Sequence, residues 1–410
     1  MNSPLRAGAN LPDAAWKRLR LRAIFDHCKW DPQCGDHAVL AKFPLLLDFG
    51  SVRELSLLAE RLTLEALTAE TEILQKPWLL KRLAIPRHIR KELQRDVPDR
   101  QPQHVRVMRF DFHFTTQGWQ ISEVNADVPG GYIEASGWNE LFVQHYPGTA
   151  SPVSATECYV DAICQRVAHG GLVALAHATV HSEDRQVMVH ISRELERRGI
   201  RSCLTSPAHL CWENGNARLQ SSFASEAPEL IVRFSPAEWL PELSANGNWK
   251  GWFHENTTPL SNPGRALILQ SKRFPLVWSD LETELRTWKS CLPVTRCPSE
   301  VRTLNDATNV LKPAFGRVGE GVGIPGVTGS KDYDEILLAA RKHELQWIAQ
   351  ERFDVVPVAC EEGKVFPCVG VYTVDGKMAG LYGRAARQPI VDGDALDVAI
   401  LLRDQERGCE

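Results

Sequence analysis

The sequence lacks an excess of basic charge, a long apolar run and closely spaced cysteines. Its 47 Lys and Arg residues nearly balance its 51 Asp and Glu residues, for a formal net charge of −4, so nucleic acid is not expected as a partner. No stretch approaches the roughly 20 apolar residues that cross a bilayer, and the N-terminal segment lacks the apolar run of a signal peptide. These absences predict a cytoplasmic protein that binds small molecules rather than nucleic acid or membranes.

The cysteine pattern excludes two further classes of protein. The 11 cysteines are too few for a disulfide scaffold, and pairs such as Cys28 and Cys34 lie too far apart in the sequence for an ordinary zinc site. We therefore expect reduced thiols with mainly structural roles. The remaining composition, 43% hydrophobic and 24% charged, is that of a globular protein, and 410 residues suggest two or three domains.

Helical periodicity dominates residues 14–83. Within residues 52–67 apolar side chains recur three and four apart, which predicts one apolar helix face. Residues 105–114 then alternate with period two, and a Gln-Gly turn leads into a second alternating stretch at residues 119–125. The sequence therefore predicts a helical N-terminal region followed by a β-hairpin.

The rest of the chain alternates between strands and helices. Strands at residues 171–176, 202–204 and 229–234, with a helix at residues 182–199, are typical of an α/β unit. A Gly-, Asn- and Pro-rich segment at residues 246–263 looks like a boundary. Beyond it we expect a helix at residues 265–289, a strand ending at Lys312-Pro313, a Gly-rich stretch, a helix at residues 332–343 and two or three closing strands.

The predicted hairpin carries Arg109, Asp111, Glu123 and Asn125 at alternating positions. Alternate residues of a strand point to the same face, so the hairpin can bring two carboxylates and an amide oxygen together. Such oxygen ligands are what Mg²⁺ prefers, and Arg109 beside them suits an anionic substrate or a phosphate. A solvated hairpin face with an Arg–Asp ion pair is the alternative.

A second candidate site begins at Lys312 and continues through the glycines to Gly323. A lysine at a strand end followed by glycines is typical of a flexible cover on phosphates. The stretch is neither a P-loop nor a dinucleotide fingerprint. On spacing alone, an ordinary hairpin loop whose glycines serve turn geometry is slightly favoured over the phosphate cover.

In their order along the chain, these motifs resemble the synthetase portion of glutathionylspermidine synthase and its stand-alone relatives. The family's RxD and ExNADxP motifs are similar to Arg109-Phe-Asp111 and to residues 123–129, and its KPxxGREG motif is similar to residues 312–319. Further similarities lie at residues 182–183, 237–239, 271–273, 350–351 and 380–384, and the resemblance runs from about residue 30 to residue 400.

The resemblance implies an α+β or α/β chain with an ATP-grasp fold and a preceding helical and α/β substrate domain, the preATP-grasp domain. The expected division is a helical N-terminal region at residues 1–100, a metal-binding hairpin segment of the ATP-grasp core at residues 101–150, the α/β substrate domain at residues 151–260 and the nucleotide-binding region at residues 261–410.

The resemblance also implies an ATP-dependent carboxylate–amine ligase that forms an amide through an acyl-phosphate and releases ADP and phosphate. Its small-molecule substrates would be an amino acid or peptide carboxylate and an amine, and two Mg²⁺ ions would be held by Asp111, Glu123 and Asn125. The implied ATP contacts are Arg109, Lys272, Lys312, Arg317, Gly319, Gln350, Glu351, Phe353 and Ile390. The implied catalytic residues are Arg109 and Arg384, and the implied substrate contacts are Val128, Ser182, Glu183 and Glu238.

The chain departs from the family's motifs in three places. Val318 and Ala385 stand where the family has Glu, and Val128 stands where it has Thr. Glu320 can substitute for the first Glu only if the loop shifts, and Arg387 competes with Arg384 for the catalytic role. These changes predict a substrate pair other than glutathione and spermidine.

Two other functions stay open from the sequence. One is a non-catalytic or regulatory ATP-binding protein, and the other is a kinase-like phosphotransferase. No segment resembles the amidase domain of the bifunctional synthase, so that form is not expected. Oligomerisation is left open.

Overall fold

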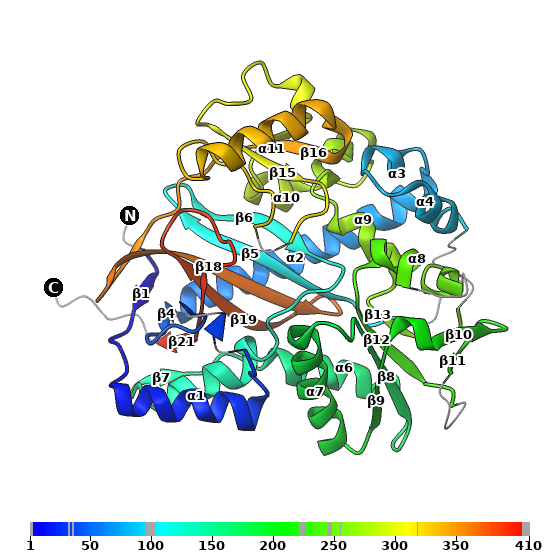
Figure 1. Cartoon of the computed structure of the whole chain (residues 1–410), viewed down its shortest axis with the longest axis horizontal. Coiled ribbons are helices and arrows are strands. Elements are labelled where there is room, and N and C mark those ends of the chain that lie inside the picture. The colour runs from blue at the N-terminus through cyan, green and yellow to red at the C-terminus, as the bar shows by residue number, and fades with distance from the viewer. Residues whose placement is uncertain are drawn as a thin grey trace.

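The computed structural model describes residues 3–31, 33–34, 37–95, 103–220, 226–243, 248–254, 256–317 and 319–403 (Figure 1). The helices are α1 (Asp13–His27), α2 (Phe49–Gln75), α3 (Leu79–Arg82), α4 (Arg87–Leu93), α5 (Asn139–Val143), α6 (Ala155–Cys164), α7 (Ser182–Arg197), α8 (Leu240–Leu243), α9 (Leu267–Gln270), α10 (Arg286–Cys291) and α11 (Ser330–Lys342). The strands are β1 (Leu5–Ala7), β2 (Gln33–Cys34), β3 (His37–Ala38), β4 (Leu45–Asp48), β5 (Val107–Thr115), β6 (Gly118–Asn125), β7 (Thr149–Ala150), β8 (Leu172–His177), β9 (Arg201–Thr205), β10 (Leu210–Glu213), β11 (Asn216–Leu219), β12 (Leu230–Phe234), β13 (Leu260–Ser261), β14 (Thr295–Arg296), β15 (Asn309–Pro313), β16 (Trp347–Glu351), β17 (Val358–Cys360), β18 (Gly363–Val374), β19 (Lys377–Ala386), β20 (Leu396–Val398) and β21 (Ile400–Arg403).

A six-stranded antiparallel sheet lies at the centre of the molecule (Figure 1). Its order is β20-β19-β18-β5-β6, with β17 pairing to β18 outside this path. The β5–β6 pair is the hairpin predicted from alternation, and Gly118 opens β6 with a φ of 97°, which favours glycine. The central sheet therefore contains the first candidate site.

Helix α2 packs against one face of the central sheet. Its buried residues, among them Leu55, Leu62 and Ile73, form the apolar stripe that the sequence predicted, and they share a core with Phe110 and Phe112 of β5. Burying one such side chain contributes roughly 1.5–3 kcal/mol. Because strand residues alternate, the intervening polar residues of β5 point to the opposite face, which α2 leaves uncovered.

The α/β unit predicted for the middle of the chain is confirmed. Strands β13, β12, β8 and β9 form a parallel sheet in that order, and the apolar sides of α6 and α7 share a core with it. Strand β8 is buried along its whole length, as is typical of a parallel strand covered on both faces. This unit carries the N-terminal end of α7, whose Glu183 lines the same cavity as Arg109 of the central sheet.

A third unit carries the predicted strand and helix around Lys312. Strands β14, β16 and β15 form a small antiparallel sheet in that order, and α11 packs on it through Tyr333 and Ala340. Lys312 near the end of β15 and Gln350 near the end of β16 lie in neighbouring strands. The second candidate site is therefore brought toward the open face of the central sheet.

The N-terminal region is less helical than its periodicity predicted. Strand β4 lies within residues 14–83 and joins β1, β21 and β7 in a four-stranded sheet, pairing parallel with β21. The Leu45–Asp48 strand is short and unbroken in apolar character, so periodicity cannot tell it from helix. Its partner on one side, β1, is near in the chain, but its partner on the other side, β21, is more than three hundred residues away.

Two further expectations were wrong. Residues 265–289 do not form one helix but break into α9, a 3₁₀ segment at Phe274–Asp280 and the start of α10, because Pro275 lacks the N–H that a continuous helix needs. The closing part contains six described strands, β16 to β21, rather than two or three. Strands β17 and β20 are only three residues long, too short to show alternation.

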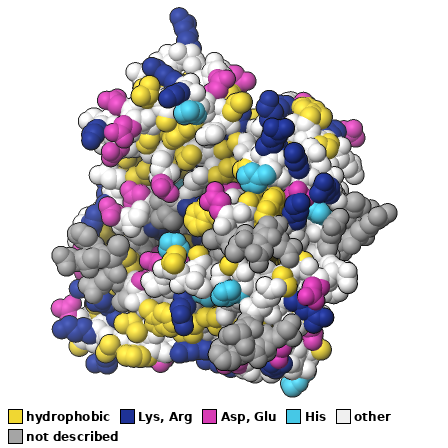
Figure 2. Space-filling view, turned by 45° about the vertical axis from the view of Figure 1, so that its right-hand side comes forward, with side chains coloured by type: hydrophobic (Ala, Val, Ile, Leu, Met, Phe, Trp, Pro, Cys, Tyr) yellow, Lys and Arg dark blue, Asp and Glu magenta, His cyan; other side chains and the backbone are white. Residues whose placement is uncertain are grey.

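Among the described residues no helix is both long and apolar enough to span a membrane. Figure 2 shows basic and acidic side chains interspersed over one face of the molecule, in line with the near balance of charge in the sequence.

Candidate active site

A cavity of about 570 Å³ opens on the uncovered face of the central sheet, between the β15–β16 pair and the N-terminal end of α7. All the candidate site residues from the sequence line it except Ser182 and Glu238. Those that line it are Arg109, Asp111, Glu123, Asn125, Val128, Glu183, Lys272, Lys312, Arg317, Gly319, Gln350, Glu351, Phe353, Arg384 and Ile390.

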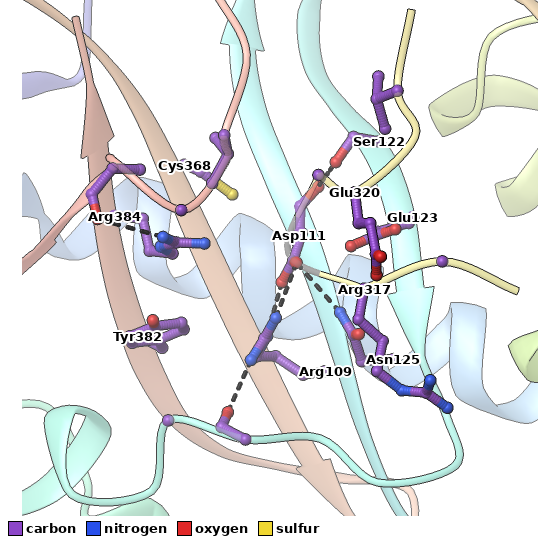
Figure 3. A pocket seen from close by; sticks show the side chains of 18 of the residues that line it. Arg109, Asp111, Ser122, Glu123, Asn125, Arg317, Glu320, Cys368, Tyr382 and Arg384 are labelled. Atoms are coloured by element: carbon purple, nitrogen blue, oxygen red, sulfur yellow. Dashed lines mark hydrogen bonds and ion pairs between the residues drawn. The ribbon is translucent and has the colours of Figure 1, made fainter. Parts of the chain in front are cut away.

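The β5–β6 hairpin holds four of these residues in one polar group. The strand register places Arg109 opposite Asn125 and Asp111 opposite Glu123. Arg109 donates two parallel hydrogen bonds to Asp111, Nε to Oδ1 at 2.7 Å and Nη2 to Oδ2 at 2.9 Å, and Asn125 Nδ2 donates to Asp111 Oδ2 at 3.1 Å (Figure 3). The same-face placement predicted from alternation is therefore present.

A bulge in this hairpin also serves the site. Ser122 is the extra residue between the Asp111–Glu123 and Phe112–Ile121 pairs. Its carbonyl oxygen accepts a hydrogen bond from Lys312 Nζ at 2.9 Å. The irregular strand thus ties the hairpin to β15.

Two lysines face the hairpin from other elements. Lys312 Nζ also donates to Gln350 Oε1 at 2.8 Å, and Lys272 Nζ lies 3.0 Å from Glu123 Oε2. Burial lowers the pKa of Lys312 to about 8, Glu123 opposes that change and Lys272 adds to it. Burial alone would raise the pKa of Glu123, but the two ammonium groups have the larger effect and hold the pKa of this carboxyl below its ordinary value. The site is built for a strongly anionic ligand.

The same residues fit a hard divalent cation. Asp111 and Glu123 supply carboxylates and Asn125 an amide oxygen, all from facing positions of one hairpin. In the described part of the chain no group of three or more His, Cys, Asp and Glu side chains is arranged to hold a metal ion. Two carboxylates with one amide, completed by phosphate oxygens and water, match the donor set of a Mg²⁺–nucleotide site rather than of an all-protein metal site.

Strand β19 supplies the side of the cavity opposite the hairpin residues. Arg384 is 14% exposed, and its Nη2 donates to the carbonyl oxygens of Asp392 at 2.7 Å and Ala395 at 3.1 Å. The Tyr382 ring lies 4.9 Å from the guanidinium carbon of Arg109. Figure 3 shows Arg384 and Tyr382 on the side of Arg109 away from Asn125. Arg387, in contrast, is 60% exposed and pairs with Glu362.

The Gly-rich stretch after Lys312 covers part of the cavity. Arg317 forms an ion pair with Glu238, and its guanidinium lies over the Trp239 ring at 4.6 Å. A Cβ on Gly319, whose φ is 71°, would come within 2.6 Å of the carbonyl oxygen of Val391. Val318 lies outside the described residues. The stretch therefore contacts both the α/β unit and the loop after β19.

The model of one family, described as glutathionylspermidine synthase preATP-grasp, matches residues 37–400. The chain belongs to this family. A comparison with curated proteins found no match. A glutathione synthetase-like effector from Globodera pallida, in its apo form, is similar in structure with a TM-score of 0.60 and 12% identity, over 94% of this chain and 97% of that one.

Two other solved structures are less similar. One is a putative γ-glutamylcysteine synthetase from Methylobacillus flagellatus, with a TM-score of 0.39 and 13% identity over 79% of this chain and 82% of that one. The other is D-alanyl-alanine synthetase A from Vibrio cholerae, with a TM-score of 0.33 and 14% identity over 53% and 67%. The family match and the Globodera structure confirm the predicted fold class, an ATP-grasp fold with a preATP-grasp domain.

The departures from the glutathionylspermidine synthase motifs occupy different surroundings. Ala385 is buried in the core beneath the sheet, so it faces away from the cavity that its neighbour Arg384 lines. Val128 lines the cavity and makes that stretch of wall apolar. Glu320 also lines the cavity, two residues beyond the position of the expected Glu. Among the described residues of the cavity wall, only the replacement of the family's Thr by Val128 therefore removes a polar side chain.

Two predicted substrate contacts lie off the cavity wall. Ser182 is exposed at the start of α7, where the next residue, Glu183, turns into the cavity. Successive helix residues point about 100° apart, so the two cannot share a direction. Glu238 is engaged by Arg317 of the Gly-rich stretch.

Sequence reasoning missed several residues of the cavity wall. His113 lies two positions after Asp111 on the same face of β5, so alternation alone could have identified it. Tyr382 lies two positions before Arg384 and could have been found in the same way. Lys29, Glu134 and Asp397 come from three distant segments, and no local pattern marks them.

Proposed function

We propose that the protein is an ATP-dependent carboxylate–amine ligase. The observation that carries this proposal is the meeting of the carboxylates Asp111 and Glu123 with the cations Lys272 and Lys312 in one buried site. Phosphoryl transfer needs positioned charge more than covalent help from the protein, and these groups supply it. Membership in the glutathionylspermidine synthase family supports the same reaction class.

In the proposed arrangement the triphosphate lies between the hairpin and the lysines. Lys272 and Lys312 hold phosphate oxygens, and the adenine lies between the β16 end and the loop after β19, against Phe353 and Ile390. Asp111, Glu123 and Asn125 would hold Mg²⁺, which would supply positive charge to the phosphates. Glu351, whose carboxylate pairs with Arg296 at 2.8 Å, contributes to the wall of this part of the cavity.

The proposed reaction has two steps. A substrate carboxylate oxygen attacks the γ-phosphorus of ATP, the bond to the β-phosphate oxygen breaks, and ADP and an acyl-phosphate form. The amine nitrogen then attacks the acyl carbon, inorganic phosphate leaves, and the nitrogen loses one proton. Arg109 on β5 and Arg384 on β19 both line the cavity and would stabilise the anionic oxygens in both steps.

Incubation with ATP, Mg²⁺ and pools of amino acids and amines tests the proposal. ADP together with a new amide mass supports the ligase. ADP with a phosphorylated product and no amide indicates a phosphotransferase, and nucleotide binding without ADP formation indicates a non-catalytic protein. Either of these two results would overturn the proposed reaction.

Nucleotide affinity is expected to fall as pH rises through 8. The phosphates bind the protonated form of Lys312, whose pKa is about 8, so the Kd for ATP should rise about tenfold between pH 7 and pH 9. Calorimetry in EDTA measures this without a contribution from metal binding. Lys312→Arg keeps its charge over this range, so its affinity should be nearly independent of pH. An unchanged slope in that variant would assign the titration to another group.

Nucleotide is expected to protect the Gly-rich stretch from trypsin. Arg317 is the cleavage point, and the ion pair with Glu238 is one of its restraints. ATP with Mg²⁺ should slow cleavage after Arg317 several-fold, because the stretch closes on the phosphates. Glu238→Gln should speed cleavage in the absence of nucleotide. Mass spectrometry of the fragments reports both rates, and equal cleavage with and without ATP would count against a lid.

A further inference from the structure

A carboxylate-rich recess lies in the cavity wall beyond Tyr382. Lys29 follows α1 and is only 5% exposed. Its Nζ lies 2.5 Å from Glu134 Oε1 and 3.2 Å from both Asp31 Oδ1 and Asp397 Oδ2. A primary ammonium has three N–H donors, and here each finds a different carboxylate.

The recess is held together by more than Lys29. Gln186 Nε2 donates to Asp31 Oδ1 at 2.6 Å, and the Tyr382 hydroxyl donates to Asp397 Oδ1 at 2.6 Å. These two carboxylates are therefore oriented by neutral donors that do not depend on the lysine. The recess sets three carboxylates against two cations, Lys29 and Arg384, whose Nε lies 4.0 Å from Asp397 Oδ1. The recess has the charge and geometry of a binding site for an ammonium group.

The recess belongs to the same cavity as the proposed reaction. Lys29, Asp31, Glu134 and Asp397 all line it. Tyr382 lies between the recess and Arg109, because its hydroxyl donates to Asp397 while its ring lies against the guanidinium of Arg109. One tyrosine side chain thus separates the recess from the guanidinium proposed to stabilise the acyl-phosphate.

We propose that Lys29 determines which amines the enzyme accepts. Its ammonium fills the recess in which the second ammonium of a diamine would otherwise bind, so the amine substrate carries a single amino group. This inference rests on the proposed ligase function. A purely structural ion network would tie the segment after α1 to β20 without affecting the choice of amine.

The first experiment needs no turnover. Lys29→Ala leaves the recess empty, and its thermal unfolding midpoint should rise with increasing propylammonium chloride, because the added cation binds the folded state. Propanol and tetramethylammonium should have no such effect, and the wild type should not respond to propylammonium. Lys42→Ala is the matched control, since Lys42 pairs with Asp13 at the surface and is 40% exposed. If propylammonium does not raise the unfolding midpoint of Lys29→Ala, the recess is not an ammonium site.

The second experiment measures the choice of amine. In the ADP-forming assay, Lys29→Ala should raise kcat/KM for 1,4-diaminobutane relative to butylamine by about tenfold or more over the wild-type ratio. If this variant does not fold, Lys29→Ala with Glu134→Gln removes one carboxylate together with the ammonium and serves in its place. If propylammonium stabilises Lys29→Ala but the kcat/KM ratio of 1,4-diaminobutane to butylamine is unchanged, Lys29 has no role in specificity and only a structural one. A wild type that forms no amide refutes the proposed ligase function, whereas the rescue experiment judges the recess independently.

Discussion

Glu123→Gln is expected to abolish Mg²⁺-dependent ADP formation while leaving the fold intact. The carboxylate lies opposite Asp111 in the hairpin and 3.0 Å from Lys272 Nζ. Glutamine keeps the size of the side chain but removes the charge that a divalent cation needs. Loss of an outer-shell partner of a metal already costs roughly 10–100-fold, so loss of a direct ligand should exceed that.

Initial rates of ADP release across a Mg²⁺ titration measure this effect. Glu284→Gln is the matched control, because Glu284 is exposed and pairs only with Arg286 in the described structure. Its rates should match the wild type. Circular dichroism of Glu123→Gln should match the wild type, whereas its unfolding midpoint should fall, because the 7% exposed Lys272 loses its partner. Wild-type turnover in Glu123→Gln would remove the metal assignment.

The part of this site that lies on one hairpin was predictable from the sequence. Alternation fixes which residues of each strand share a face. The short turn alone would place Asp111 opposite Ser122, and the bulge at Ser122 brings Glu123 to that position instead. The shared face was therefore predictable from local rules, but the pairing of Asp111 with Glu123 was not. The helices α2, α7 and α11 were predictable for the same reason, because the signal for each is its own periodicity.

Contacts between distant segments were not predictable in this way. Lys29 pairs with Asp397 because the segment after α1 lies against β20. No pattern in the sequence around either residue indicates this contact. Strand β4 is a similar case, because its partner β21 lies at the other end of the chain. The prediction of one helix at residues 265–289 was wrong for another reason. Pro275 interrupts a helix that the composition of this segment would otherwise favour.

Arg384→Ala is expected to bind ATP almost normally but to lose about 10²–10³-fold in product formation. Its guanidinium is anchored by the carbonyl oxygens of Asp392 and Ala395, and its Nε lies 4.0 Å from Asp397 Oδ1. A held donor that points into the cavity is suited to the charge that develops on a phosphorylated carboxylate. Removal of one such preorganised donor typically costs about 3–4 kcal/mol.

Arg384→Lys should recover little of this loss, because an ammonium cannot make the paired, planar hydrogen bonds of a guanidinium. Arg387→Ala provides the decisive comparison. Arg387 is 60% exposed, its partner is Glu362 at 2.8 Å, and it does not line the described cavity. Its variant should therefore turn over at nearly the wild-type rate. Single-turnover measurements with saturating ATP separate the chemical step from nucleotide binding in all three variants. If Arg387→Ala lost product formation and Arg384→Ala kept it, Arg387 would be the catalytic arginine. The strand β19 would then have to change its geometry to bring Arg387 into the cavity.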